Sequence, residues 1–86
     1  MVASMHELSL AIDLVERASE IAKNSHAAKV TKVKMLIGPN SGVDPVALHF
    51  AFSEATRDTM LADAALEIFA GVDREFQFKS MEVEDV

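Results

Sequence analysis

The sequence predicts an α+β domain in which two helices pack on one face of a three-stranded sheet, in the order α-β-α-β-β. Two segments repeat apolar residues at helical spacing, three others alternate apolar with polar residues, and turn-forming residues separate them. Half of the 86 residues are hydrophobic, which is typical of a packed fold. The length leaves room for one core, so residues 1–86 are predicted to form a single domain.

The first helix is predicted to cover about residues 5–24. Its buried side is expected to carry apolar residues at every third or fourth position: Leu8, Ile12, Val15, Ala18 or Ser19, and Ala22, with Ala11 and Ile21 beside them. Ser4 and Glu7 fit a capping box, in which the two side chains satisfy free N–H groups of the first turn. Residues 24–26 are expected to end the helix.

The next two elements are a strand and a second helix. In "KVTKVKMLIG" the apolar phase alternates with a phase that carries two lysines, which predicts a half-buried strand ending at the turn 38–42. Asp44 and Pro45 suit the N-cap and the first position of the second helix. That helix is predicted to run to about Arg57 or Met60, and its inward residues are Leu48, Ala51, Phe52 and Ala55.

The last two strands follow from alternation in "AALEIFAGV" and "EFQFKSMEVEDV". In the first, Leu66 and Ile68 alternate with Glu67 and Phe69. In the second, the apolar phase slips near Ser80, which predicts a β-bulge there.

Composition excludes several classes of function. A net charge of −6 argues against nucleic-acid binding, which needs a basic surface. The sequence has no cysteine, which excludes disulfides, thiolate zinc sites and cysteine nucleophiles. No apolar run is long enough to cross a membrane and no signal sequence opens the chain, so we expect a cytoplasmic protein. No catalytic motif is present, so we expect no enzyme.

Four stretches, in order along the chain, resemble one family. They are "MHELSLAIDLVE", "VTKVKMLIG", "PVALHFAFSEATRDTMLADAALEI" and "EFQFKSMEVED". Together they resemble the HypA/HybF proteins, which deliver nickel during maturation of [NiFe]-hydrogenases and, in some bacteria, of urease. The resemblance implies an accessory protein in hydrogenase maturation, with a HypB-like GTPase and the hydrogenase large subunit as partners.

The resemblance also implies a nickel site at the Met-His-Glu motif. His6 would be the principal ligand, with Met5 and Glu7 beside it, and Asp44 stands where some relatives carry an acidic residue implicated in nickel handling. In the family this motif lies at the free N-terminus, whereas here four residues precede it. Met5 therefore offers an amide nitrogen in place of an amine, and an amide is a poor ligand until it is deprotonated. This predicts a weakened nickel site.

A purely structural interpretation of the same residues stays open. Ser4 would cap the first helix, Glu7 would be its capping-box partner, and His6 would be a surface residue. The partial positive charge of a helix N-terminus disfavours a bound cation. An N-cap role is likewise sufficient for Asp44.

The sequence departs from the family once more. The family has a cysteine-rich zinc-binding domain between its second and third strands, whereas here residues 71–74 pass directly from one strand to the next. We therefore expect no zinc, and a tight hairpin at this join. A natural short homologue and an engineered deletion both remain open.

The rival hypothesis is a protein-interaction module that keeps the fold without the metal. Such a module would act as a scaffold in a maturation complex, or would form homo-oligomers through exposed strand edges.

Overall fold

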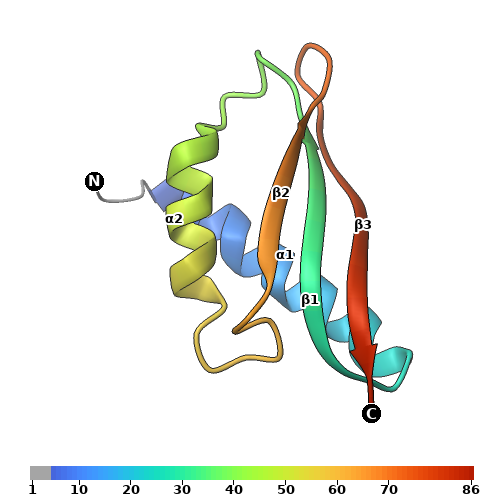
Figure 1. Ribbon diagram of the computed structural model, residues 1–86. Coiled ribbons are helices and arrows are strands. Elements are labelled where there is room, and N and C mark those ends of the chain that lie inside the picture. The colour runs from blue at the N-terminus through green and yellow to red at the C-terminus, as the bar shows by residue number, and fades with distance from the viewer. Residues whose placement is uncertain (1–4) are drawn as a thin grey trace.

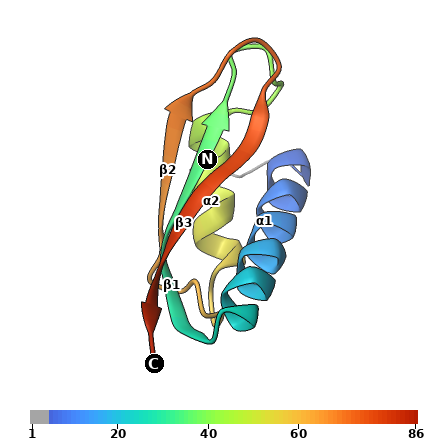
Figure 2. The ribbon, with the colours of Figure 1, turned by 90° about the vertical axis from the view of Figure 1, so that its right-hand side faces the viewer.

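Both helices lie on the same face of the sheet (Figures 1 and 2). The computed structural model describes residues 5–86. Its elements are α1 (Met5–Asn24), β1 (Ala27–Ile37), α2 (Pro45–Ala55), β2 (Ala65–Ala70) and β3 (Phe76–Asp85). The predicted fold class and element order are confirmed, although α2 ends earlier than expected. Within the described residues, none of the helices has the length and apolar character needed to span a membrane.

The long strand β1 is the centre of the sheet, with β2 parallel on one side and β3 antiparallel on the other. The expected hairpin between β2 and β3 is therefore wrong, because β1 lies between them. Ile37 pairs with both Ala70 and Phe76, so β2 ends and β3 begins on opposite sides of one residue. Two strand spacings are about 10 Å. The short link 71–75 can cross that distance over the end of β1.

This link packs closely on the residue that follows β1. The N–H of Gly71 donates to the carbonyl of Ile37 at 3.0 Å, and the N–H of Gly38 donates to the carbonyl of Glu75 at 2.7 Å. A Cβ atom added at Gly38 would lie 2.3 Å from the carbonyl oxygen of Asp73. A side chain at position 38 would therefore collide with the backbone of the link, and glycine is required there.

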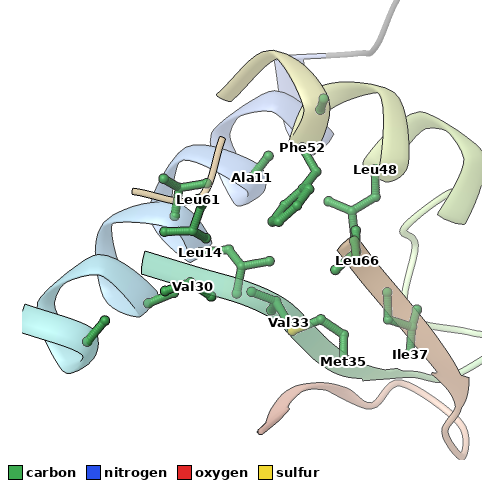
Figure 3. Packing of buried hydrophobic residues seen from close by; sticks show 14 residues of the cluster. Ala11, Leu14, Val30, Val33, Met35, Ile37, Leu48, Phe52, Leu61 and Leu66 are labelled. Atoms are coloured by element: carbon green, nitrogen blue, oxygen red, sulfur yellow. The ribbon is translucent and has the colours of Figure 1, made fainter. Parts of the chain in front are cut away.

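The core lies between the helices and the inner face of the sheet (Figure 3). Its largest fully buried side chains are Met35, Leu48, Leu61, Val30 and Val33. The inward residues predicted for α2 are confirmed, since Leu48, Ala51 and Phe52 are buried and Ala55 is partly buried.

The predicted buried side of α1 is confirmed at Ala11, Val15, Ala18 and Ala22, which are all buried. It is wrong at Ile12 and Ile21, which are 43% and 38% exposed, and it lacked Leu14, which is buried. The helix contacts both α2 and β1, so its buried side faces the angle between these two elements. The small alanine side chains allow α1 to approach these two elements closely. Alanine is only weakly hydrophobic, so it contributes little when the buried side of a helix is predicted from hydrophobicity.

The predicted bulge near Ser80 is confirmed. Lys34 pairs with Ser80 and Met35 pairs with Phe78, so Lys79 is the extra residue in β3. Its ammonium nitrogen lies 4.3 Å from the centroid of the Phe69 ring, which is within range of a cation–π contact.

The lysines of β1 form ion pairs with both neighbouring strands. Lys32 Nζ lies 3.2 Å from Glu67 Oε2, and Lys34 Nζ lies 3.0 Å from Glu82 Oε2. The hydrogen bond with Lys34, followed by the charges of Lys32 and Lys34, lowers the pKa of Glu82 below 4.5. The hydrogen bond with Glu67, followed by the charges of Glu67 and Glu82, raises the pKa of Lys32 above 10.5.

These shifts predict how the stability of the sheet depends on pH. A lowered carboxylate pKa stabilises the fold above the unfolded-state value, and this contribution is lost as the pH falls through the folded-state pKa. We therefore expect Glu82→Gln to lower the free energy of unfolding slightly at neutral pH, because the pair is solvent-exposed, and to have no effect in strong acid. Urea unfolding of both proteins across the acid range measures this difference. A difference that persists unchanged in strong acid would contradict the prediction.

Candidate functional site

The residues of the Met-His-Glu motif begin α1. Met5 is the first residue of the helix, and His6 is exposed in the first turn, so its imidazole is accessible to a ligand in solution. The predicted cap residue Ser4 and the side chain of Met5 lie outside the described residues.

Asp44 is the N-cap of α2, as predicted. Its φ and ψ of −82° and 116° are extended, and its side chain accepts a hydrogen bond from the N–H of Val46 at 3.0 Å. Pro45 follows in the first turn, and the N–H of Leu48 donates to the carbonyl of Asp44 at 2.9 Å. Asp44 is itself exposed, so a capping role leaves its carboxylate accessible to solvent.

Glu7 connects the two helix starts. Glu7 is only 5% exposed, and its Oε2 accepts a hydrogen bond from the backbone N–H of Asp44 at 3.2 Å. Figures 1 and 2 show the first turns of α1 and α2 near one another, in agreement with this contact. The structure therefore brings together two of the four predicted site residues, Glu7 and Asp44, which are far apart in the sequence.

The described side chains do not form a conventional metal site. Within residues 5–86, no three His, Cys, Asp or Glu side chains are grouped so that they could hold a metal ion. A nickel ion bound through His6 would need backbone nitrogen ligands in addition. Nitrogen ligands in a planar array suit Ni(II).

A cleft on the described surface lies elsewhere. It has a volume of about 600 Å³ and lies between the second half of α1 and the loop 58–60. Two of its carboxylates, Glu16 and Glu20, are about three and four helical turns from His6 along α1, and a third, Asp58, lies in the loop. The candidate site is therefore an exposed helix end and not a pocket.

Sequence reasoning missed an exposed apolar strip on α2. Val46 is 64% exposed and Phe50 is 43% exposed, and residues four apart lie on one side of a helix. The available signal was the composition of "PVALHFAFSEA", which is apolar around most of the helix and so cannot bury every side.

Comparison with known proteins identifies a family. The model of the family described as "Hydrogenase/urease nickel incorporation, metallochaperone, hypA" matches residues 5–79. The hydrogenase maturation factor HypA of Albidiferax ferrireducens is 45% identical over 64 residues, which are 74% of this chain and 57% of that protein. The factor of the same name from Synechococcus elongatus is 47% identical with the same coverage. The chain thus matches little more than half the length of these curated relatives.

Solved structures show the same fold. The solution structure of the Ni metallochaperone HypA from Helicobacter pylori matches with a TM-score of 0.82 and 19% identity, over 93% of this chain and 98% of that chain. A second match, the solution structure of a HypA protein, has a TM-score of 0.79 and 22% identity, over 94% and 98% of the two chains.

Proposed function

Because this chain belongs to the HypA family, we propose that it is a nickel-binding accessory protein in the maturation of [NiFe]-hydrogenases, with a weakened N-terminal site. Its chemistry would be metal transfer and not catalysis. The observation that carries the proposal is that His6, within the Met-His-Glu motif, lies exposed in the first turn of α1. There the imidazole can bind Ni²⁺ and release it by ligand exchange.

The proposed ligand set combines the His6 imidazole with nearby nitrogen and oxygen groups. Met5 contributes its backbone nitrogen, and Asp44, whose exposed carboxylate begins α2, contributes an oxygen. Four residues precede Met5, so its nitrogen is an amide that must lose a proton before it binds Ni²⁺. This requirement makes the site weaker than one with a free amine and makes it stronger with rising pH.

We also propose which partners the protein has, where it is located, and that it binds no zinc. By family resemblance the partners are a HypB-like GTPase and the hydrogenase large subunit, and the location is the cytoplasm. Only residues 71–75 join β2 to β3, and the chain contains no cysteine, so we propose that it handles nickel without a zinc module, as a single domain.

Replacing His6 by alanine tests nickel binding. We expect His6→Ala to weaken Ni²⁺ binding at least about tenfold, because the imidazole is the principal side-chain ligand. Isothermal titration of the full chain with Ni²⁺ measures the dissociation constant. His49→Ala is the matched control, since His49 is also exposed but lies on α2, and it should bind nickel like the parent. Equal affinities for the parent and His6→Ala would reject nickel delivery through this motif.

A second candidate function is a metal-independent interaction module. The observation that favours it is the exposed strip of Val46 and Phe50 on α2, because exposed apolar groups on one helix side suit a protein partner. This candidate differs from nickel delivery in that partner binding would not depend on His6 or on nickel.

A further inference from the structure

The cleft between the second half of α1 and the loop 58–60 has no part in the proposed nickel function. Its volume of about 600 Å³ lies within the range of about 300–1,000 Å³ that is typical of ligand-binding pockets. Val15 of α1 and Met60 of the loop give the cleft an apolar lining. The cleft can therefore take up an apolar side chain of a binding partner.

Hydrogen bonds hold the loop side of the cleft in place. The hydroxyl of Thr59 donates to the carbonyl of Thr56 at 2.7 Å and accepts the N–H of Leu61 at 3.0 Å. The carbonyl of Met60 accepts the N–H of Val30, which belongs to β1, at 2.9 Å. The cleft is thus formed before a partner arrives, which lowers the entropy cost of binding.

Three exposed carboxylates border the cleft. Glu16 and Glu20 lie on α1, and Asp58 lies in the loop. Of the described residues that line the cleft, only Lys23 is a cation, and within residues 5–86 none of the three carboxylates forms an ion pair. The lysines of β1, by contrast, pair with glutamates of both neighbouring strands. The border of the cleft therefore keeps a local negative charge that attracts a basic partner.

We propose that this cleft binds a basic amphipathic helix of a partner protein, which inserts an apolar side chain beside Val15 and Met60. Residues four apart lie one turn apart on the same side of a helix. Glu16 and Glu20 have this spacing on α1, so lysines or arginines four apart on the partner helix can face them. The inference concerns a surface away from His6 and does not rest on nickel binding.

A designed peptide tests the chemistry of the partner. The probe is a helix of about 15 residues with leucines on one side and lysines on the other. NMR titration of the full chain without nickel reports which backbone amides shift and the dissociation constant. We expect the largest shifts at Ser19, Lys23 and Thr59, which line the cleft. Largest shifts at Val46 and Phe50 would place the peptide on α2 and overturn the inference.

Removing the border charges tests the role of the carboxylates. The variant combines Glu16→Gln, Glu20→Gln and Asp58→Asn, and asparagine tolerates the φ of 63° at position 58. We expect it to bind the peptide at least about tenfold more weakly than the parent in about 0.1 M salt. These side chains are exposed, so the variant should unfold in urea much as the parent does.

A variant that loses the same charge elsewhere is the matched control. It combines Glu67→Gln, Glu82→Gln and Glu84→Gln on β2 and β3. In about 0.1 M salt the Debye length is about 10 Å, so more distant exposed charges are largely screened. We expect this variant to bind the peptide within about twofold of the parent. Equal weakening of both variants would show that net charge alone attracts the peptide, and would overturn the inference.

A second peptide tests the apolar lining. It keeps the lysines but has alanine in place of every leucine, and we expect it to bind at least about tenfold more weakly than the first. Equal binding of the two peptides, or no binding of the first to the parent, would overturn the inference. Neither result depends on the Ni²⁺ titration of His6→Ala, so this inference and the proposed function can fail separately.

Discussion

Removing residues 1–4, so that the chain begins at Met5, is expected to tighten Ni²⁺ binding at least about a hundredfold. The removal converts the backbone nitrogen of Met5 from an amide into an amine, which binds a metal ion once it loses its ammonium proton. Changes in groups that only contact the ligands alter metal affinity by about 10–100-fold. Gaining a direct ligand should therefore raise the affinity for Ni²⁺ by at least the upper end of that range. Isothermal titration of the two chains with Ni²⁺, at one pH, gives the ratio.

Acetylation of the shortened chain is the decisive control. An acetyl group restores an amide at Met5 without restoring the four residues, so it separates the effect of the amine from the effect of their removal. We expect the acetylated chain to bind as weakly as the full chain. Tight binding by the full chain, equal to that of the shortened chain, would show that the preceding residues do not weaken the site.

Replacing Phe52 by alanine is expected to lower the free energy of unfolding by about 3–5 kcal/mol, which is typical of a buried phenylalanine. Phe52 is 3% exposed and points from α2 into the layer between the helices and the sheet (Figure 3). Truncation would leave a cavity in the core between the helices and the sheet. Small domains have a total stability of about 5–15 kcal/mol, so a large share would be lost. Urea unfolding followed by circular dichroism measures the change.

Phe50 provides the matched control on the same helix. It is 43% exposed, so Phe50→Ala removes the same side chain from a position that is already in contact with water. We expect this variant to differ from the parent by less than about 1 kcal/mol. Equal losses for the two variants would indicate that the exposed strip on α2 is packed in solution, for example against another molecule.

The parts of the fold that local patterns determine could be predicted from the sequence. The capping pair Asp44 and Pro45 marked the start of α2, and the phase slip marked the bulge at Lys79. Strand order depends on pairing between distant segments, and a short link between β2 and β3 was compatible with a hairpin. The structure instead places β1 between them, because a link of five residues can also cross the end of one strand.

The candidate site was predicted as residue types but not as an arrangement. The sequence marked His6, Glu7 and Asp44 separately, each with a structural alternative. No periodicity could indicate that the Glu7 carboxylate reaches the backbone of Asp44, because the contact depends on how α1 and α2 pack. The exposure of Ile12 has the same origin: which side of a helix is buried depends on both neighbours.

The position of β1 also affects how a nascent chain acquires this fold. β1 is synthesised before its antiparallel neighbour β3, which is the last strand of the described residues. Until Phe76–Asp85 has emerged from the exit tunnel, the N–H and C=O groups along one side of the central strand have no partner strand. An unpaired edge of this kind promotes association with other chains. The protein is therefore most exposed to misassembly in the interval before β3 pairs with β1.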